Sequence, residues 1–202
     1  MKVAILGASG RAGSEITKEL ARRGHEVLAI DQNPDAVPQA PEVTPVAGDA
    51  FDPAALSKLL KGSDAVISAL RFDVPAATLL SAVRQAGVTR LLVTGGAGSL
   101  EVAPGVRLID APNFPEEAKP FVMGGITFLE DLRSETEIDW IFFSPPADFF
   151  VGPRVGRYRL GRDQLVTDAA GDSKISFADY AIAMVDELEQ PQHSRVRFTA
   201  AY

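Results

Sequence analysis

The sequence predicts an α/β protein whose core is a doubly wound parallel sheet. Short apolar segments alternate with amphipathic helical patterns along most of the chain, as expected for strands buried on both faces. The first apolar segment ends in a glycine-rich turn that leads directly into a helical pattern. Such alternation favours right-handed crossovers, with helices on both faces of one sheet. At 202 residues, 46% of them hydrophobic, the chain is long enough to bury one core.

The first strand and helix have clear local signals. Val3 to Leu6 is an apolar run bounded by glycine, which is typical of a buried strand. In the helical pattern over residues 11–23, Ile16 and Leu20 recur on one face, and Gly24 supplies the stop. A strand and a helix therefore flank the first glycine-rich turn.

The second helix is marked at both ends. Asp52 is a suitable N-cap, Pro53 occupies the first helical position, and Gly62 ends the pattern. The remaining elements follow from apolar runs and helical periodicity, and we expect strands at 25–30, 43–47, 64–70, 90–96 and 139–146 and helices at 75–86 and 116–136. Ligands of open α/β sheets bind outside the carboxyl ends of the strands, so the residues that end each strand are the candidates for a site.

Beyond Pro146 the alternation becomes irregular. We expect a twisted hairpin over residues 156–176, a helix over 177–190 and a last strand over 195–202. The acids within "VDELEQ" in that helix are expected to be helix-surface charges. The prediction is a single domain over residues 1–202, in which residues 145–202 form a small C-terminal extension on the substrate side.

Composition and charge narrow the classes of partner and site. A net charge of −7 repels polyanions, so we expect neither nucleic acid nor an anionic membrane as a partner. The absence of cysteine excludes disulfides and zinc sites built on thiolates. The short apolar run at the start does not resemble a signal peptide, and we expect a cytoplasmic protein. We predict no metal site, because His25 and His193 are far apart, with His25 at the surface beside the helix stop.

The glycine-rich turn is the strongest functional signal. Gly7, Gly10 and Gly13 permit a tight turn, close approach of backbone N–H groups to a pyrophosphate, and close packing of the helix on the strand. The helix N-terminus would then bind the phosphate charge. A purely steric role for the glycines is the alternative. We predict a dinucleotide cofactor, with contacts from Gly7, Ser9, Gly10, Arg11, Ala12 and Gly13.

Asp31 bears on which dinucleotide binds. It ends the second strand, where a carboxylate accepts hydrogen bonds from the adenosine ribose and repels a 2′-phosphate. That repulsion is about 4 kcal/mol for two unit charges 4 Å apart at an effective dielectric of 20. We therefore favour NAD(H) over NADP(H). Arg11 weakens this preference, since it could swing toward a 2′-phosphate, and an ordinary turn residue before Asn33 and Pro34 is the alternative reading of Asp31.

With these motifs the chain resembles the atypical short-chain dehydrogenases/reductases. The resemblance is to the NADH-flavin reductases and NAD(P)H-binding proteins related to biliverdin-IXβ reductase, and it covers nearly the whole chain. It is carried by "GASGRAG", "GDAFDPAAL", "DAVISAL", "RLLVTGGAGSL", "DWIFFSPP" and the tail from Tyr158 to Tyr202. The resemblance implies a Rossmann-type fold. Relatives often have an arginine where this chain has Asp31 and Gln32, which bears on the usual NADP(H) preference of the group.

The resemblance also implies positions for the rest of the cofactor. By this likeness the adenine would contact Asp49 and Ala50, and the ribose would lie beside Ser68, Ala69 and Leu70. The nicotinamide would lie by Thr94, Gly95 and Gly96 and would be covered by Pro145 and Pro146. Structural roles are the alternatives: a turn for Asp49, hydrogen bonds to strand-end backbone for Ser68 and Thr94, and a strand end for the prolines.

The usual catalytic pair of short-chain dehydrogenases is absent. Members that act on alcohols and sugars use Tyr-x-x-x-Lys, whereas here Tyr158 is followed by Arg162 and Tyr180 by Met184 at that spacing. This argues against alcohol dehydrogenation, epimerisation and dehydration, which need a positioned proton-transfer group. Hydride transfer to a flavin or quinone requires fewer catalytic groups from the protein, because the acceptor is already electrophilic and water can supply protons.

An acceptor pocket is predicted from the long connection over residues 95–120, which is longer than packing requires and resembles a lid. Large apolar residues near the predicted nicotinamide end would form flat walls for the acceptor, with core packing as the alternative. These residues are Phe114, Phe121, Met123 and Phe149. A basic cluster could hold an anionic acceptor or form a solvated hairpin face that pairs with Asp163, and it comprises Arg154, Arg157, Arg159 and Arg162.

The leading hypothesis is an NAD(P)H-dependent reductase of a small planar acceptor such as a flavin or quinone, with no catalytic residue assigned. A second is a non-catalytic sensor of the nicotinamide pool, similar to the NmrA-like regulators. An epimerase or dehydratase is a third. The expected partner is a small-molecule acceptor, and the sequence leaves a monomer and a homodimer equally open.

Overall fold

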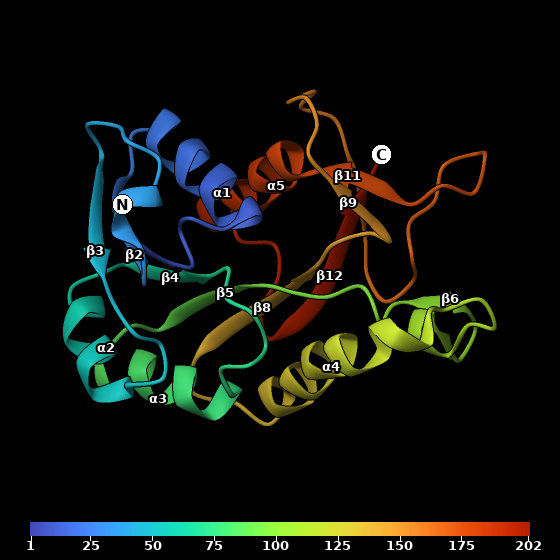
Figure 1. Ribbon diagram of the computed structural model, residues 1–202, viewed down its shortest axis with the longest axis horizontal. Helices are drawn as coiled ribbons and strands as arrows, with labels where there is room; N and C mark the ends of the chain where they lie inside the picture. Colours follow the sequence, from blue (N-terminus) through green and yellow to red (C-terminus); the bar gives the residue numbers. More distant parts are fainter.

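The protein is built on an eight-stranded, mostly parallel sheet, and the computed structural model describes residues 1–202 (Figure 1). The strand order is β10-β12-β8-β5-β4-β1-β2-β3, and only β10 runs antiparallel to its neighbour. The order reverses between β1 and β4, which opens a crevice at the edge where the parallel strands end. The strands are β1 Lys2–Leu6, β2 Glu26–Asp31, β3 Val43–Ala47, β4 Ala65–Ser68, β5 Arg90–Thr94, β8 Asp139–Ser144, β10 Arg159–Gly161 and β12 Val196–Ala201.

Helices cover both faces of the sheet, as the doubly wound prediction requires. Figure 1 shows α1 (Arg11–Arg22) and α5 (Phe177–Glu189) on one face and α2, α3 and α4 on the other. The latter three span Pro53–Leu60, Ala76–Gln85 and Lys119–Arg133, and short 3-10 turns lie at Pro34–Ala36, Leu108–Asp110 and Glu116–Ala118. Each face has its own buried apolar core. None of the helices is both long and apolar enough to cross a membrane, and a cytoplasmic location stays a prediction.

The local signals of the first 146 residues are confirmed. Asp52 caps α2, because its Oδ1 accepts hydrogen bonds from the backbone N–H groups of Ala54 at 3.1 Å and Ala55 at 2.9 Å. Gly24 follows α1 with φ +76°, a left-handed conformation that L side chains rarely adopt. Trp140 is 2% exposed in the core between the sheet and the α2–α4 face.

The C-terminal region departs from the prediction. Residues 156–176 do not form a hairpin: β10 pairs with β12, and β11 (Lys174–Ser176) pairs in parallel with β9 (Asp148–Phe150). Both partners lie outside the segment, and the pairing satisfies backbone groups of β9 and of the sheet strand β12. In addition, β12 joins the main sheet beside β8, so the region supplies core as well as the substrate side.

The connection over residues 95–120 is not a free lid. It contains the small sheet of β6 (Glu101–Ala103) and β7 (Val106–Arg107). Glu101 exchanges backbone hydrogen bonds with a distant segment, donating to Asp163 O and accepting from Leu165 N, both at 2.8 Å. The segment therefore forms a packed platform beside β10, visible at one end of α4 (Figure 1).

The charged residues that were expected at the surface have other partners than expected. Arg154 binds the buried carboxylate of Glu19, and Arg159 donates to backbone carbonyls, so these arginines do not form one anion-binding cluster. Asp163 pairs with Arg197 instead. His25 is only 6% exposed, because α5 covers it, and its Nε2 lies 2.9 Å from a Glu189 carboxylate oxygen.

The acids near the end of α5 also have partners. Glu187 is 5% exposed and binds the guanidinium of Arg90 at 3.0 Å and the ring of His193 at 2.8 Å. Asp186 and Glu189 both accept from Arg23, so these acids are not simple surface charges as expected. Sequence periodicity alone did not show that α5 packs its acidic side against α1.

Candidate functional site

The glycine-rich turn crosses the crevice between β1 and β4. Gly7 has φ +74°, and a β-carbon there would lie 2.8 Å from the carbonyl oxygen of Ala69. A β-carbon at Gly13 would lie 2.0 Å from the carbonyl oxygen of Gly7, so α1 approaches the turn more closely than any other residue permits. Gly10 closes the turn by donating to Gly7 O at 3.1 Å, and α1 begins at the next residue. The N-terminus of α1 therefore faces the crevice.

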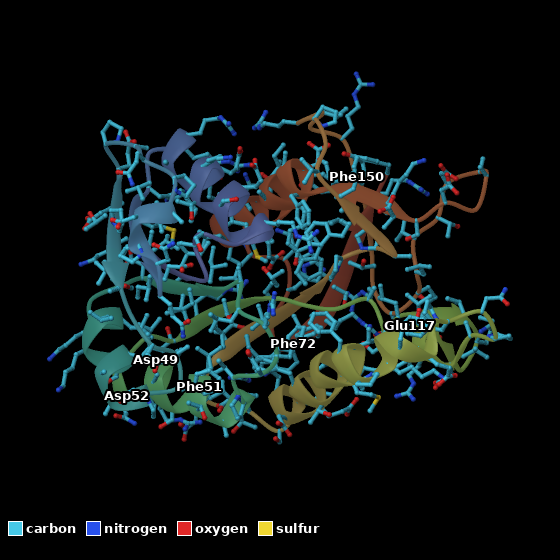
Figure 2. All side chains as sticks on the ribbon, in the orientation of Figure 1. Asp49, Phe51, Asp52, Phe72, Glu117 and Phe150 are labelled. Carbon is cyan, nitrogen blue, oxygen red and sulfur yellow. The ribbon has the colours of Figure 1, made fainter.

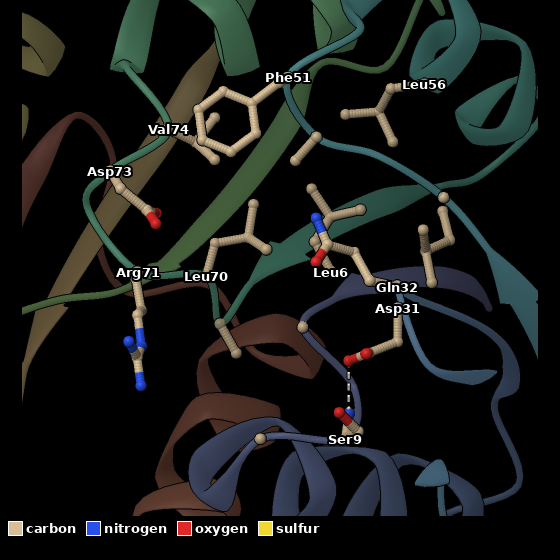
Figure 3. Close-up of a pocket in the computed structure, with 16 residues that line it drawn as sticks. Leu6, Ser9, Asp31, Gln32, Phe51, Leu56, Leu70, Arg71, Asp73 and Val74 are labelled. Carbon is tan, nitrogen blue, oxygen red and sulfur yellow. Dashed lines mark hydrogen bonds between the residues drawn. The ribbon is translucent and has the colours of Figure 1, made fainter. Parts of the chain in front are cut away.

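Asp31 fixes this turn from the end of β2. Its Oδ2 accepts a hydrogen bond from Ser9 N at 2.9 Å (Figure 3). Its Oδ1 accepts one from Asn33 N, also at 2.9 Å. Partial burial raises the pKa of the Asp31 carboxyl, but the hydrogen bonds from Asn33 and Ser9 outweigh it and leave the pKa below its ordinary value. The side chain is thus an anion at neutral pH, held at the rim of the crevice.

The crevice contains a pocket of about 250 Å³ at the ends of β1, β2 and β4. Figure 3 shows Asp31 and Gln32 on one side of it and Leu70 and Arg71 on the other. Seven of the predicted residues line it: Gly7, Ser9, Gly10, Asp31, Ala50, Ala69 and Leu70. It is completed by residues that sequence reasoning did not assign to the cofactor: Leu6, Ile30, Gln32, Gly48, Phe51, Leu56, Arg71, Asp73 and Val74. Several follow a predicted strand end directly, so counting one or two residues beyond each strand would have found them.

Some predicted adenosine-side residues lie next to this pocket without lining it. The exposed Asp49 turns its carboxylate to the backbone N–H of Phe51 at 3.0 Å, near the start of α2 (Figure 2). Ser68 is buried within the end of β4. Arg11 leans away, with its guanidinium carbon 5.5 Å from the centre of the Phe177 ring in α5. Arg11 is therefore not beside Asp31, where the alternative role for a 2′-phosphate would place it, and Ala12 follows it in the first turn of α1.

The residues predicted for the nicotinamide side gather at the ends of β5 and β8. Gly95 donates its N–H to Phe143 O at 2.8 Å, and a β-carbon there would lie 2.4 Å from the Phe142 ring. The hydroxyl of Thr94 is buried and has no hydrogen-bond partner. A β-carbon at Gly96 would be 3.7 Å from the Phe72 ring. The two strand ends are thus adjacent, and Pro145 and Pro146 follow β8 as buried residues.

The four residues predicted for the acceptor do not come together. Phe149 packs against Phe177 at 4.0 Å and Tyr180 at 4.7 Å between ring centres. Phe121 is 67% exposed and lines a second pocket with residues of the β4–α3 loop. Met123 is 43% exposed on α4, outside that pocket, and Phe114 is half-buried in the connection before α4.

Comparison with known proteins identifies the family. A family model described as NAD(P)H-binding matches residues 7–191. The chain belongs to this NAD(P)H-binding family. It is 45% identical to the "Uncharacterized protein YwnB" of Bacillus subtilis, with 98% of this chain and 97% of that protein covered.

Solved structures with the same Rossmann-type fold agree with this assignment. A Bacteroides thetaiotaomicron protein described as a "putative epimerase" is 43% identical, with a TM-score of 0.94, and 100% of this chain and 96% of that chain are covered. A Streptococcus pneumoniae protein described as a "putative NADH-flavin reductase" is 38% identical, with a TM-score of 0.87 over 100% of this chain and 99% of that chain. The resemblance inferred from the sequence motifs is confirmed.

The geometry fits the NAD(P)H that the family binds. The positive φ of Gly7 and the close contact at Gly13 leave backbone N–H groups and a helix N-terminus exposed to the crevice, as a pyrophosphate requires. The pocket beside them has apolar walls from Leu6, Leu56 and Leu70 and a fixed carboxylate at its rim. The adenosine half of the cofactor is therefore the part that this pocket suits.

Each of the three tyrosine hydroxyls donates to a group of the protein, that of Tyr202 to the carboxylate of Asp179 at 2.7 Å. Tyr180 is fully buried, its hydroxyl donates to Phe143 O at 2.5 Å, and burial raises the pKa of the phenol. Tyr158 donates to the carboxylate of Asp186, and burial followed by that carboxylate raises its pKa too. Both phenols are therefore held as neutral structural donors far from ionisation at neutral pH.

Proposed function

We propose that this protein is an NAD(P)H-dependent oxidoreductase that reduces a small planar acceptor, such as a flavin or quinone, and prefers NADH. The observation that carries the proposal is the pocket between β1, β2 and β4, with the glycine turn on one side and the ionised Asp31 at its rim. Family membership supports cofactor binding, and the likeness to a "putative NADH-flavin reductase" supports the class of acceptor.

The preference for NADH rests on where the charges lie. Asp31 presents a carboxylate at the rim of the pocket proposed for the adenosine half, and Arg11 leans toward Phe177 rather than toward Asp31. A 2′-phosphate would meet this carboxylate without a neutralising arginine beside it. Ribose hydroxyls, in contrast, can donate to it.

A planar electrophilic acceptor matches the lack of an accessible tyrosine. Transfer of a hydride from the reduced nicotinamide to a flavin or quinone, with a proton from water, yields the oxidised cofactor and the reduced acceptor. This chain would bind and align the two rings, for which proximity and orientation are sufficient. Neither Tyr158 nor Tyr180 is needed as an acid.

The direct test is the loss of reduced-nicotinamide absorbance with purified protein and FMN, run in parallel with NADH and NADPH. We expect faster loss with NADH. Faster loss with NADPH would overturn the preference assigned to Asp31. If cofactor binds but no flavin or quinone in a panel is reduced, the reductase proposal fails.

A non-catalytic sensor of the nicotinamide pool is the second candidate. It is favoured by the burial of Tyr180 and the pairing of Tyr158 with Asp186, which leave no tyrosine for proton transfer. A sensor must bind NADH and NAD⁺ with different affinities, since equal affinities shift no equilibrium. Titration calorimetry with both forms distinguishes it, and equal affinities would reject it. The lack of a tyrosine for proton transfer also makes an epimerase the least favoured of the three functions.

A further inference from the structure

We propose that Arg71 and Phe121 form the acceptor subsite and that Arg71 selects planar acceptors carrying an anionic group. The inference rests on the proposed reductase function and adds the charge of the acceptor to it. It begins with a second pocket of about 280 Å³, enclosed by the β4–α3 loop and the first turns of α4. Its lining residues are Arg71, Phe72, Asp73, Pro120, Phe121 and Gly124.

The second pocket adjoins the cofactor pocket. Arg71 and Asp73 line both, so the loop after β4 forms a shared wall between them. Phe72, which lies between α4 and the strands in Figure 2, also approaches Gly96 at the predicted nicotinamide side. A ring held in the second pocket would therefore lie at the edge where the parallel strands end, next to the cofactor.

The close approach of α4 to this loop depends on two glycines. A β-carbon at Gly124 would lie 3.2 Å from Phe72 Cβ, and one at Gly125 would lie 2.9 Å from the Phe72 ring. This approach brings the first turn of α4, with Phe121, over the loop that carries Arg71. Phe121 remains 67% exposed, although large aromatic side chains are mostly buried. An exposed aromatic wall beside a cofactor pocket suits stacking with a planar ligand.

Arg71 is the cation available at this wall. Its side chain is exposed, forms none of the ion pairs of the protein, and extends from the side of the pocket opposite Asp31 (Figure 3). Asp73 also faces both pockets but makes no ion pair with Arg71. An unpaired guanidinium can form a charge-assisted hydrogen bond with an anionic group of a ligand. The glycine turn and the α1 N-terminus already serve the cofactor phosphates.

FMN and riboflavin test the charge directly, because they share the isoalloxazine ring and differ by one phosphate. Quenching of flavin fluorescence measures the binding of each to the protein. We expect Arg71→Met to weaken FMN binding about tenfold and to leave riboflavin binding unchanged, since one charge-assisted hydrogen bond is lost. NADH affinity is measured in parallel, because Arg71 also lines the cofactor pocket. The matched control is Arg157→Met, which removes an exposed arginine that lines a different, shallow hollow and should change none of these values.

A second pair of variants tests the aromatic wall formed by Phe121. Phe121→Leu should weaken FMN and riboflavin equally, by about fivefold, because ring stacking is lost for both. Met123→Leu alters an exposed apolar residue of the same helix outside the pocket and should have no effect.

The outcomes separate the two proposals. Equal binding of FMN and riboflavin by the unaltered protein, or a loss of NADH rather than FMN affinity in Arg71→Met, overturns the subsite while flavin turnover upholds the reductase. Flavin binding that depends on Arg71, without any reduction of flavins or quinones, supports the subsite and rejects the reductase.

Discussion

The two sides of the candidate site are built in different ways. The adenosine side is centred on the glycine turn and the end of β2, which hydrogen bonds within the protein already fix, as Asp31 does for Ser9. Residues that follow β3 and β4 complete its pocket. The acceptor side draws on the β4–α3 loop, α4 and the strand ends of β5 and β8. There, Arg71 and the hydroxyl of Thr94 have no partner within the protein.

The difference is one of sequence separation. The glycine turn and Asp31 come from neighbouring segments and recur wherever their motif recurs, whereas a surface made from four distant segments can vary freely on the same fold. The fold therefore indicates the cofactor, and only side chains of the acceptor side can define the acceptor. The following variants test the adenosine side and its connection to the C-terminal region, from the largest expected effect to the smallest.

The adenosine side should be disrupted most severely at Gly13. In Gly13→Ala the new β-carbon would lie 2.0 Å from Gly7 O, so α1 must move away from the turn. We expect a loss of about 3 kcal/mol in the free energy of unfolding and loss of NADH binding. Gly24→Ala is the control, because φ is positive there, at +76°, but a β-carbon at Gly24 would have no atom within 4 Å. It should cost about 1 to 2 kcal/mol and leave NADH binding intact. Denaturant unfolding and cofactor titration measure both effects.

Glu19 connects the adenosine side to the C-terminal region. It is 1% exposed in α1, whose N-terminus carries the glycine turn, and it binds Arg154 in the segment after β9 at 2.9 Å. Glu19→Gln should cost about 2 kcal/mol, because the buried carboxylate loses its charge-assisted hydrogen bonds from Arg23 and Arg154. The exposed pair of Glu15 and Lys18 supplies the control, and Glu15→Gln should cost less than about 0.5 kcal/mol in the same denaturant assay. Equal losses in the two variants would contradict a structural role for Glu19.

The same carboxylate predicts a pH dependence. Burial raises the pKa of Glu19, but hydrogen bonds from Arg154 and Arg23 outweigh it and lower the pKa from 4.5 to about 2. The folded state therefore binds the proton less tightly than the unfolded state. The stabilisation is complete above pH 4.5 and is lost as the pH falls toward 2. Unfolding free energies between these values should show a shallower slope for Glu19→Gln than for the unaltered protein.

Cofactor preference should change through Asp31. In Asp31→Asn the repulsion of a 2′-phosphate is removed and the acceptor for ribose hydroxyls is weakened, so the ratio of NADPH to NADH affinity should rise about tenfold. Asp35→Asn alters an exposed acid of the following 3-10 turn and should leave the ratio unchanged. An unchanged ratio in Asp31→Asn would contradict the assignment of this residue to the ribose.

The smallest effect is expected at the cap of α2, beside the adenosine pocket. Asp52→Ala removes the acceptor for Ala54 N and Ala55 N and should cost about 1 kcal/mol of stability with NADH affinity unchanged. Asp49→Ala tests the predicted adenine contact at a neighbouring acid. Its carboxylate accepts only from Phe51 N, so a selective loss of NADH affinity would support that contact. Thermal unfolding and cofactor titration measure both variants.

The C-terminal region shows where sequence reasoning fails on this chain. The segment over residues 156–176 has turn residues and short apolar runs, and these favoured a local hairpin. Its strands pair instead with β9 and β12, which are separated from it along the chain. Likewise, the acids of α5 looked solvent-facing because periodicity gives the direction of a side chain relative to its own helix only. Packing of α1 against α5 decided that Asp186 and Glu189 bind Arg23.

The sequence by itself determined the alternation of elements, the glycine turn, the cap at Asp52 and Asp31 at a strand end. These are consequences of local sterics and short-range hydrogen bonds, which act over a few residues. Only the tertiary structure decided that Arg11 leans on Phe177, that Phe149 packs into the core, and that Phe121 rather than Met123 lines a pocket. Those contacts depend on which distant segments pack together at the edge of the sheet. That packing is decided by the burial of the two apolar cores, which involves the whole chain.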